Sequence, residues 1–164
     1  MHWKLKWKGA IRVDNISAFL GLIKKAGKLE VGEEPVGAAC RSKKASLVML
    51  ASDTAPNSVR RATHFAEAGE ILILPAPLDK VQMGLAIGRP PCAMLAVTDI
   101  GFAAAMAKKL YALNPDLDPA LLECLERKSQ KAMQRRKEKR AHERNLLRGK
   151  ASNRNLTSET KRKK

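Results

Sequence analysis

Apolar residues along this chain follow two alternating spacings. Residues 16–23 carry apolar side chains at intervals of three and four, which predicts an amphipathic helix that ends at Gly27. Residues 47–51, 71–74 and 94–97 are short, uninterrupted apolar runs. Such runs are typical of strands that are covered on both faces. The pattern therefore predicts buried strands connected by helices.

Further helices are expected in the segments between these runs. Pro35 suits the first turn of one helix, the turn at 52–56 opens a second, and Thr98-Asp99 precedes a helix to about Leu110. Helices of about ten residues that alternate with buried strands indicate layers of helix, sheet and helix. We expect an α/β fold, a three-layer α/β/α sandwich with a mixed, largely buried sheet, over residues 14–114.

The character of the chain changes after Asn114-Pro115. Asp118-Pro119 is a plausible helix start, and a short apolar stripe follows at residues 121–133. Beyond Met133 the sequence is polar nearly all round a helix, so it has little to bury. We expect a basic helical extension over residues 115–150 and a disordered basic tail over residues 151–164.

Positive charge is concentrated at the two ends of the chain. The net charge is +16 over 164 residues, of which residues 127–164 contribute +13 and residues 1–13 contribute +4. The remaining body, residues 14–126, is close to neutral at −1. This distribution excludes a uniformly basic, histone-like particle and indicates polyanion-binding arms on a globular domain. The charge alone does not separate RNA from DNA.

The basic N-terminal arm, residues 1–13, leaves two interpretations open. Trp3 and Trp7 alternate with lysines, so their rings could stack on bases while the lysines contact phosphates. Equally, Trp3, Leu5 and Trp7 could form the buried face of an edge strand.

No set of catalytic or metal-binding residues is recognisable. Cys40, Cys92 and Cys124 are widely spaced and form no zinc pattern, so we expect neither metal nor cofactor. Asp53 and Asp99 follow buried strands, where capping explains them more simply than catalysis. His64 fits a satisfied structural histidine. We therefore expect a protein that is not an enzyme, has no membrane segment and resides in the cytoplasm.

Four segments together resemble a known family. They are the A-G-K-L-x-x-G-x-E opening at residue 26, the K-A-x-L-V-x-L-A-x-D strand with its A-P-N turn, the stretch that ends A-I-G at Gly88, and A-V-T-D-x-G-F at residue 96. The order is similar to that of the kink-turn-binding ribosomal proteins of the "L-seven-Ae" type, with their L-thirty-e and Gadd-forty-five relatives, in particular a small bacterial branch. The resemblance covers about residues 17–110 and implies the same α/β/α sandwich.

The resemblance also implies where RNA would bind. The family uses the N-terminus of its second helix, with a Gly-x-Asn-Glu start and a lysine one turn later, and an apolar loop before its last strand. Gly32 keeps the glycine, but Glu34, Pro35 and Ala38 stand at the asparagine, glutamate and lysine positions. Glu34 can accept from a guanine amino group but cannot donate, and Pro35 has no N–H.

The expected RNA-binding residues fall into three groups. Those of the helix start and the apolar loop are Gly32, Glu33, Glu34, Arg89, Pro90 and Pro91. Lysines and arginines around the second helix are Lys28, Arg41, Lys43 and Lys44. Those of the basic extension are Arg135, Arg136, Lys139 and Arg140.

We therefore expect a non-catalytic protein whose partner is structured RNA, with kink-turn or ribosomal RNA and the ribosome itself as candidates. Two outcomes stay open for the loops. Either they read a kink-turn in a modified way, or guanine readout is lost and the basic arms supply the affinity. The alternative function is a protein-interaction scaffold with a nonspecific polyanion-binding tail for RNA or DNA.

Overall fold

The computed structural model describes the backbone of residues 10–162 and the side chains of residues 15–151. Trp3 and Trp7 lie outside the described residues. The elements are α1 (Ala10–Lys25), β1 (Leu29–Val31), α2 (Glu33–Arg41), β2 (Leu47–Leu50), α3 (Pro56–Gly69), β3 (Leu72–Pro75), α4 (Lys80–Ile87), β4 (Met94–Val97), α5 (Ile100–Leu113) and α6 (Pro119–Arg162). The chain divides into two compact units, Met1–Arg127 and Lys128–Lys164.

The sheet is mixed, as predicted. Its strand order is β1-β4-β2-β3, with β4 antiparallel to both of its neighbours and β2 parallel to β3. Val31 pairs with Leu95, and Leu50 pairs with Met94. The ends of β1, β2 and β3 and the start of β4 therefore lie in one row across the sheet. We call this row of strand ends the Gly32 edge, because Gly32 follows β1, and the row at the other strand ends the opposite edge.

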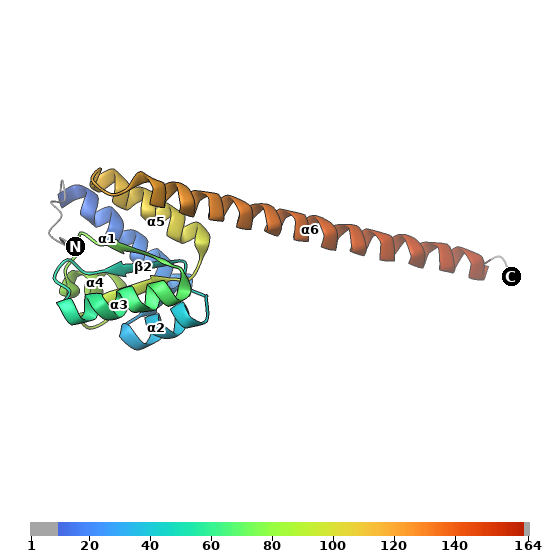
Figure 1. Ribbon diagram of the computed structural model, residues 1–164. Coiled ribbons are helices and arrows are strands. Elements are labelled where there is room, and N and C mark those ends of the chain that lie inside the picture. The colour runs from blue at the N-terminus through green and yellow to red at the C-terminus, as the bar shows by residue number, and fades with distance from the viewer. Residues whose placement is uncertain (1–9, 163–164) are drawn as a thin grey trace. The chain divides into compact units, whose positions relative to one another are not determined.

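Helices cover both faces of this sheet, which confirms the predicted three layers (Figure 1). Leu47 and Met49 of β2 pack with α1, α4 and α5 in one buried cluster. Val48 and Leu50 point to the other face and pack with α2 and α3. Successive side chains of a strand alternate between faces, so a strand buried on both sides needs an unbroken apolar run.

The first compact unit extends beyond the predicted limit at residue 114. Leu125 is buried in the larger core cluster, and Leu117 and Leu122 pack against it. A salt bridge of 3.0 Å between Lys108 and Glu126 also ties α6 to α5. The short apolar stripe after Asp118 thus completes the core of the body.

The second unit is the basic part of α6, and it is helical as far as Arg162. The sequence predicts disorder from residue 151, and the structure has helix there instead. Residues 120–162 contain no proline and only one glycine, Gly149, so nothing in this sequence breaks a helix. Within the described part of the chain, no helix has an apolar stretch long enough to cross a lipid bilayer.

Candidate nucleic-acid interface

The start of α2 and the segment before β4 lie side by side. Gly32 caps α2 with φ 95°, a conformation that favours glycine, and its N–H donates to the carbonyl of Met94 at 3.2 Å. Because β1 pairs with β4, the chain must leave β1 beside the first residue of β4. Two elements separated by more than fifty residues in the sequence therefore form one surface.

The first turn of α2 carries Glu33 and Glu34. Glu33 accepts a hydrogen bond from Arg61 of α3, and the two side chains form an ion pair. This hydrogen bond, together with the charge of Glu33, raises the pKa of the Arg61 guanidinium. Arg61 thus offsets one of the two negative charges that the sequence places at this helix end.

Residues 88–93 form the loop before β4, and Arg89, Pro90 and Pro91 are exposed. The loop begins at Gly88, which caps α4 in the left-handed conformation with φ 67°. Arg89 N–H donates to the carbonyl of Gly84 at 2.9 Å, and Cys92 N–H donates to the carbonyl of Lys80 at 3.1 Å. These bonds hold the loop against α4 and leave its apolar tip open.

The loop between β2 and α3 also supports this surface, which sequence analysis missed. Thr54 donates from Oγ1 to the carbonyl of Ala51 at 2.7 Å and contacts the carbonyl of Ala93 at 3.3 Å. Asp53 accepts from the backbone N–H of Lys80 at 2.9 Å. Asp53 therefore supports the start of α4, whereas the N-cap of its own helix α3 is Ala55. The local sequence does not show that Asp53 meets Lys80, because the pairing of β2 with β3 brings these two residues together.

The basic residues around α2 lie at the opposite edge of the sheet. Lys28 precedes β1, and Lys43 and Lys44 precede β2, so all three stand at the strand ends away from Gly32. The guanidinium of Arg41 lies 5.8 Å from the centre of the Phe65 ring, at the end of α2. The structure thus separates Lys28, Arg41, Lys43 and Lys44 from the predicted residues of the α2 N-terminus and the 88–93 loop.

The remaining predicted residues lie in the second unit. Arg135, Arg136, Lys139 and Arg140 are exposed on α6. Basic residues occur on every side of this helix, with Lys137, Arg140 and Arg144 along one shallow groove. A helix of this kind can meet phosphates in several directions.

The candidate catalytic groups do not assemble. Asp53 lies at the edge of the sheet near Gly32, whereas Asp99 lies at the other edge, where its side chain accepts from Phe102 N–H at 3.1 Å and caps α5. His64 is exposed on α3, with its ring 6.3 Å from that of Phe65, whereas the sequence favours a satisfied structural histidine. No group of three metal-ligating side chains occurs among the described residues. Cys40 is buried in the core, and that burial raises the pKa of its thiol.

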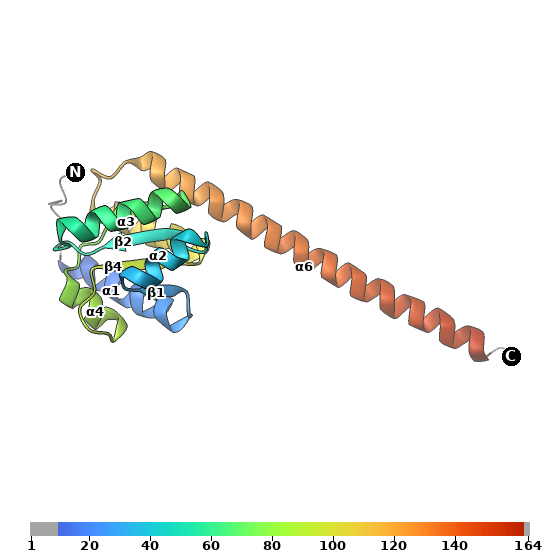
Figure 2. The same cartoon turned by 60° about the horizontal axis from the view of Figure 1, so that its bottom comes forward.

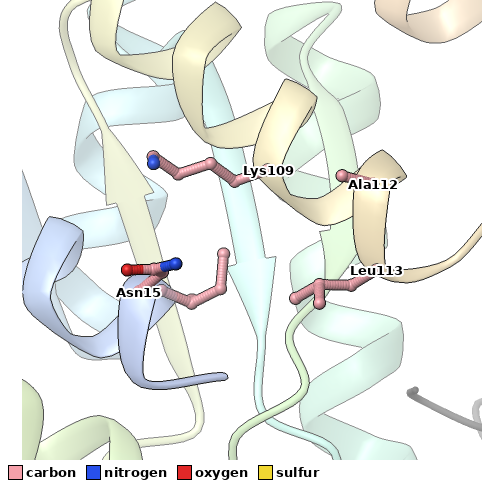
Figure 3. Close-up of a pocket in the computed structure, with 5 residues that line it drawn as sticks. Asn15, Lys109, Ala112 and Leu113 are labelled. Atoms are coloured by element: carbon pink, nitrogen blue, oxygen red, sulfur yellow. The ribbon is translucent and has the colours of Figure 1, made fainter. Parts of the chain in front are cut away.

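A shallow pocket between α1 and α5 also lacks reactive groups. Asn15 of α1 and Lys109, Ala112 and Leu113 of α5 line it (Figure 3). The ammonium of Lys109 lies 5.2 Å from the centre of the Phe19 ring. This lysine therefore has a packing partner, and the pocket offers no acid or base pair.

Gly84 provides a test of how closely α4 supports the 88–93 loop. A Cβ at this position would lie 2.6 Å from the carbonyl oxygen of Pro90 and 2.7 Å from that of Arg89. Gly84→Ala should therefore lower the free energy of unfolding by about 1–3 kcal/mol, because the loop backbone must move. Urea denaturation measures this change. Gly149→Ala is the matched control, since nothing lies within 4 Å of its Cβ and alanine favours helix. Equal stability of Gly84→Ala and the parent would contradict the packing.

Comparison with known proteins agrees with this architecture. A structure of a protein with unknown function from Bacillus halodurans is 26% identical, with a TM-score of 0.54 over 58% of this chain and 95% of that one. A 15.5kD RNA binding protein from Giardia lamblia is 15% identical, with a TM-score of 0.52 over 69% of this chain and 98% of that one. No protein with a curated description matches the chain.

One family model matches residues 14–107, more than half of the chain and nearly all of the α/β/α body. The segments that it spans include both elements of the candidate interface, the start of α2 and the loop before β4. The chain therefore belongs to the ribosomal protein L7Ae/L30e/S12e/Gadd45 family.

Proposed function

We propose that this protein binds structured RNA, with a kink-turn or ribosomal RNA as its target. In the first unit, the α2 N-terminus and the 88–93 loop would form the binding surface, and the basic residues of α6 would bind RNA as a separate element. The observation that carries the proposal is the hydrogen bond from Gly32 N–H to the Met94 carbonyl, which makes the first two elements neighbours. Family membership and the Giardia lamblia RNA binding protein support it.

The start of α2 offers donors to a phosphate or base edge. The first turn of a helix has N–H groups without an intrahelical acceptor. Gly32 uses its N–H on Met94 and Pro35 has none, so those of Glu33 and Glu34 are the donors at this end. The positive end of the helix dipole favours an anion there.

The 88–93 loop adds a different chemistry. Pro90 and Pro91 present an exposed apolar tip against which an extruded base can pack. Arg89, also exposed, can bind a phosphate with two parallel hydrogen bonds. The body thus positions RNA with few charged contacts.

Two residues weaken base-specific recognition in this proposal. Pro35 and Ala38 are both exposed on α2, and neither can donate to a base or pair with a phosphate. Most of the affinity would then come from α6, where phosphate contacts do not depend on sequence.

Restoring the family residues tests the α2 surface directly. The preference is the ratio of the affinity for a kink-turn RNA to the affinity for the same RNA with its sheared G·A pairs replaced. In the variant Glu34→Asn/Pro35→Glu/Ala38→Lys this ratio should be at least about tenfold higher than in the parent. Titrations of the full chain at two salt concentrations measure this preference.

The control for added charge is Ala112→Lys at an exposed position of α5, which has the same net charge change. The control should strengthen binding to both RNAs alike or leave it unchanged. If the restored variant behaves like this control, the α2 N-terminus is not an RNA contact.

A protein-interaction scaffold is the second candidate, and one observation favours it. Leu85 of α4 is 75% exposed, and Leu22 of the neighbouring α1 is 53% exposed. α1 and α4 touch, since a Cβ at Gly21 would lie 3.2 Å from the carbonyl oxygen of Ala86. Failure of the full chain to bind either RNA above background would favour this alternative.

A further inference from the structure

Two turns meet at the edge of the sheet opposite Gly32. Thr98 N–H donates to the carbonyl of Lys28 at 2.9 Å, which ties the α1–β1 turn to the end of β4. Ser46 N–H donates to the carbonyl of Val97 at 2.7 Å, which ties the α2–β2 turn to the same strand. We name the exposed residues Lys28, Lys43 and Lys44 the turn surface.

The backbone holds the two adjacent lysines of this surface in place. Lys43 has φ 54°, in the left-handed region, and its N–H donates to the carbonyl of Cys40 at 3.1 Å. Lys44 N–H donates to the carbonyl of Ala39 at 2.9 Å. The Cα positions of both lysines are therefore set by the end of α2, while their side chains extend into solvent.

A shallow groove leads from the α2 N-terminus to the turn surface. Its lining residues are Glu30, Pro35, Ala38, Ala39, Ser42, Lys44 and Thr98. Figure 2 shows α2 beside β1 and β4. The groove lies between them, because Glu30 of β1 and Thr98 after β4 line it together with residues of α2. Pro35 lies in the first turn of α2 and Lys44 just beyond its last turn, so the groove follows the whole helix.

The charge of the body differs between the two edges of the sheet. Acidic and basic residues are equal in number at the Gly32 edge, where Glu33, Glu34, Asp53 and Asp79 lie with Arg60, Arg61, Lys80 and Arg89. At the other edge, Lys24, Lys25 and Arg41 accompany the turn surface. The acidic residues there are Glu30 in the groove, Glu67 and Glu70 at the end of α3, and Asp99, which caps α5. Excess positive charge therefore lies away from the elements that the family uses.

We propose that the turn surface is a second contact for the RNA backbone, reached along the groove beside α2. The proposal rests on the proposed function, because it requires RNA at the α2 N-terminus. Small side chains at Pro35 and Ala38 leave the groove open to a sugar-phosphate strand, and Lys44 lines its far end. Lys28 and Lys43 are exposed on the turns beside it, so that three ammonium groups can attract phosphates. The body would then hold an RNA at both edges of its sheet.

The test uses the full chain and two RNAs, a kink-turn hairpin and the same hairpin with a single-stranded extension. The variant Lys28→Gln/Lys43→Gln/Lys44→Gln removes three positive charges from the turn surface. For the extended RNA, the slope of log affinity against log salt should fall by about 2, since each phosphate contact on a single strand contributes about 0.7. For the minimal hairpin the slope should change by less than half as much.

The matched control removes the same net charge from another surface. Asn15→Asp/Ala18→Glu/Ala112→Glu changes three exposed residues of α1 and α5. It should leave the difference between the two RNAs unchanged. Equal effects of the turn-surface variant and this control would overturn the second contact, as would equal effects on the two RNAs.

The α2 variant described above separates this proposal from the proposed function. If the restored α2 residues improve kink-turn preference while the turn-surface variant matches its control, the function stands and the second contact is wrong. If the α2 variant behaves like its own control, the α2 N-terminus is not an RNA contact, and the second contact, which requires RNA there, is wrong as well.

Discussion

Replacing Leu95 by alanine should lower the free energy of unfolding by about 2–5 kcal/mol. Leu95 is 0% exposed and lies in β4 between Val31 of β1 and Met49 of β2. Its side chain belongs to the core cluster formed with α1, α4 and α5. The cost combines the lost burial of three carbons with the cavity they leave, since strands fixed on both sides cannot close the gap.

Urea denaturation followed by far-UV circular dichroism measures this loss. The control is Leu85→Ala, which makes the same substitution where the leucine is 75% exposed and should change stability by less than about 0.5 kcal/mol. Similar losses for the two variants would mean that Leu95 is not in the core and that the register of β4 is wrong.

Neutralising the basic residues of α6 should weaken RNA binding about a hundredfold at low salt. In the full chain, Arg135, Arg136, Lys139 and Arg140 are all exposed, and changing them to glutamine removes four charges. At about 0.7 for each single-strand phosphate contact, the salt slope should fall by about 3. Glutamine has a helix propensity close to that of lysine and arginine, so the helix content should not change.

Salt-dependent filter binding with a structured RNA measures both quantities. The control Met133→Gln/Leu146→Gln/Leu147→Gln alters three exposed apolar residues of the same helix and keeps its charge. It should bind as the parent does. An unchanged salt slope in the arginine and lysine variant would show that the basic helix does not contact RNA and that the affinity resides elsewhere.

The layers of the fold could be predicted because each strand carries its own signal. Residues 47–50 and 94–97 are fully buried, and an uninterrupted apolar run is the pattern that burial on both faces requires. The helix starts were less certain. Asp99 caps α5, as predicted, but Asp53 accepts a hydrogen bond from the first backbone N–H of α4. A carboxylate can bind any N–H that the tertiary structure places near it.

The limits of the body and the extent of α6 were harder to predict. A stripe of leucines at residues 117–125 does not say which surface it covers, and only the fold shows that it completes the core. Helix propensity over residues 151–162 is a weak signal beside a high net charge, which led us to expect disorder.

Sequence patterns were enough to predict the alternation of strands and helices, the neutral body with its basic end, and the resemblance that the family match bears out. These properties depend on local spacing and composition, which can be read without knowing which distant residues are in contact. Which candidate residues share a surface could be told only from the fold. The pairing of β1 with β4 joins Gly32 to the loop of Arg89, and the same pairing places Lys28 and Lys44 at the opposite edge. Strand direction and order set these positions, and hydrogen bonds between segments distant in sequence leave no trace in a local pattern.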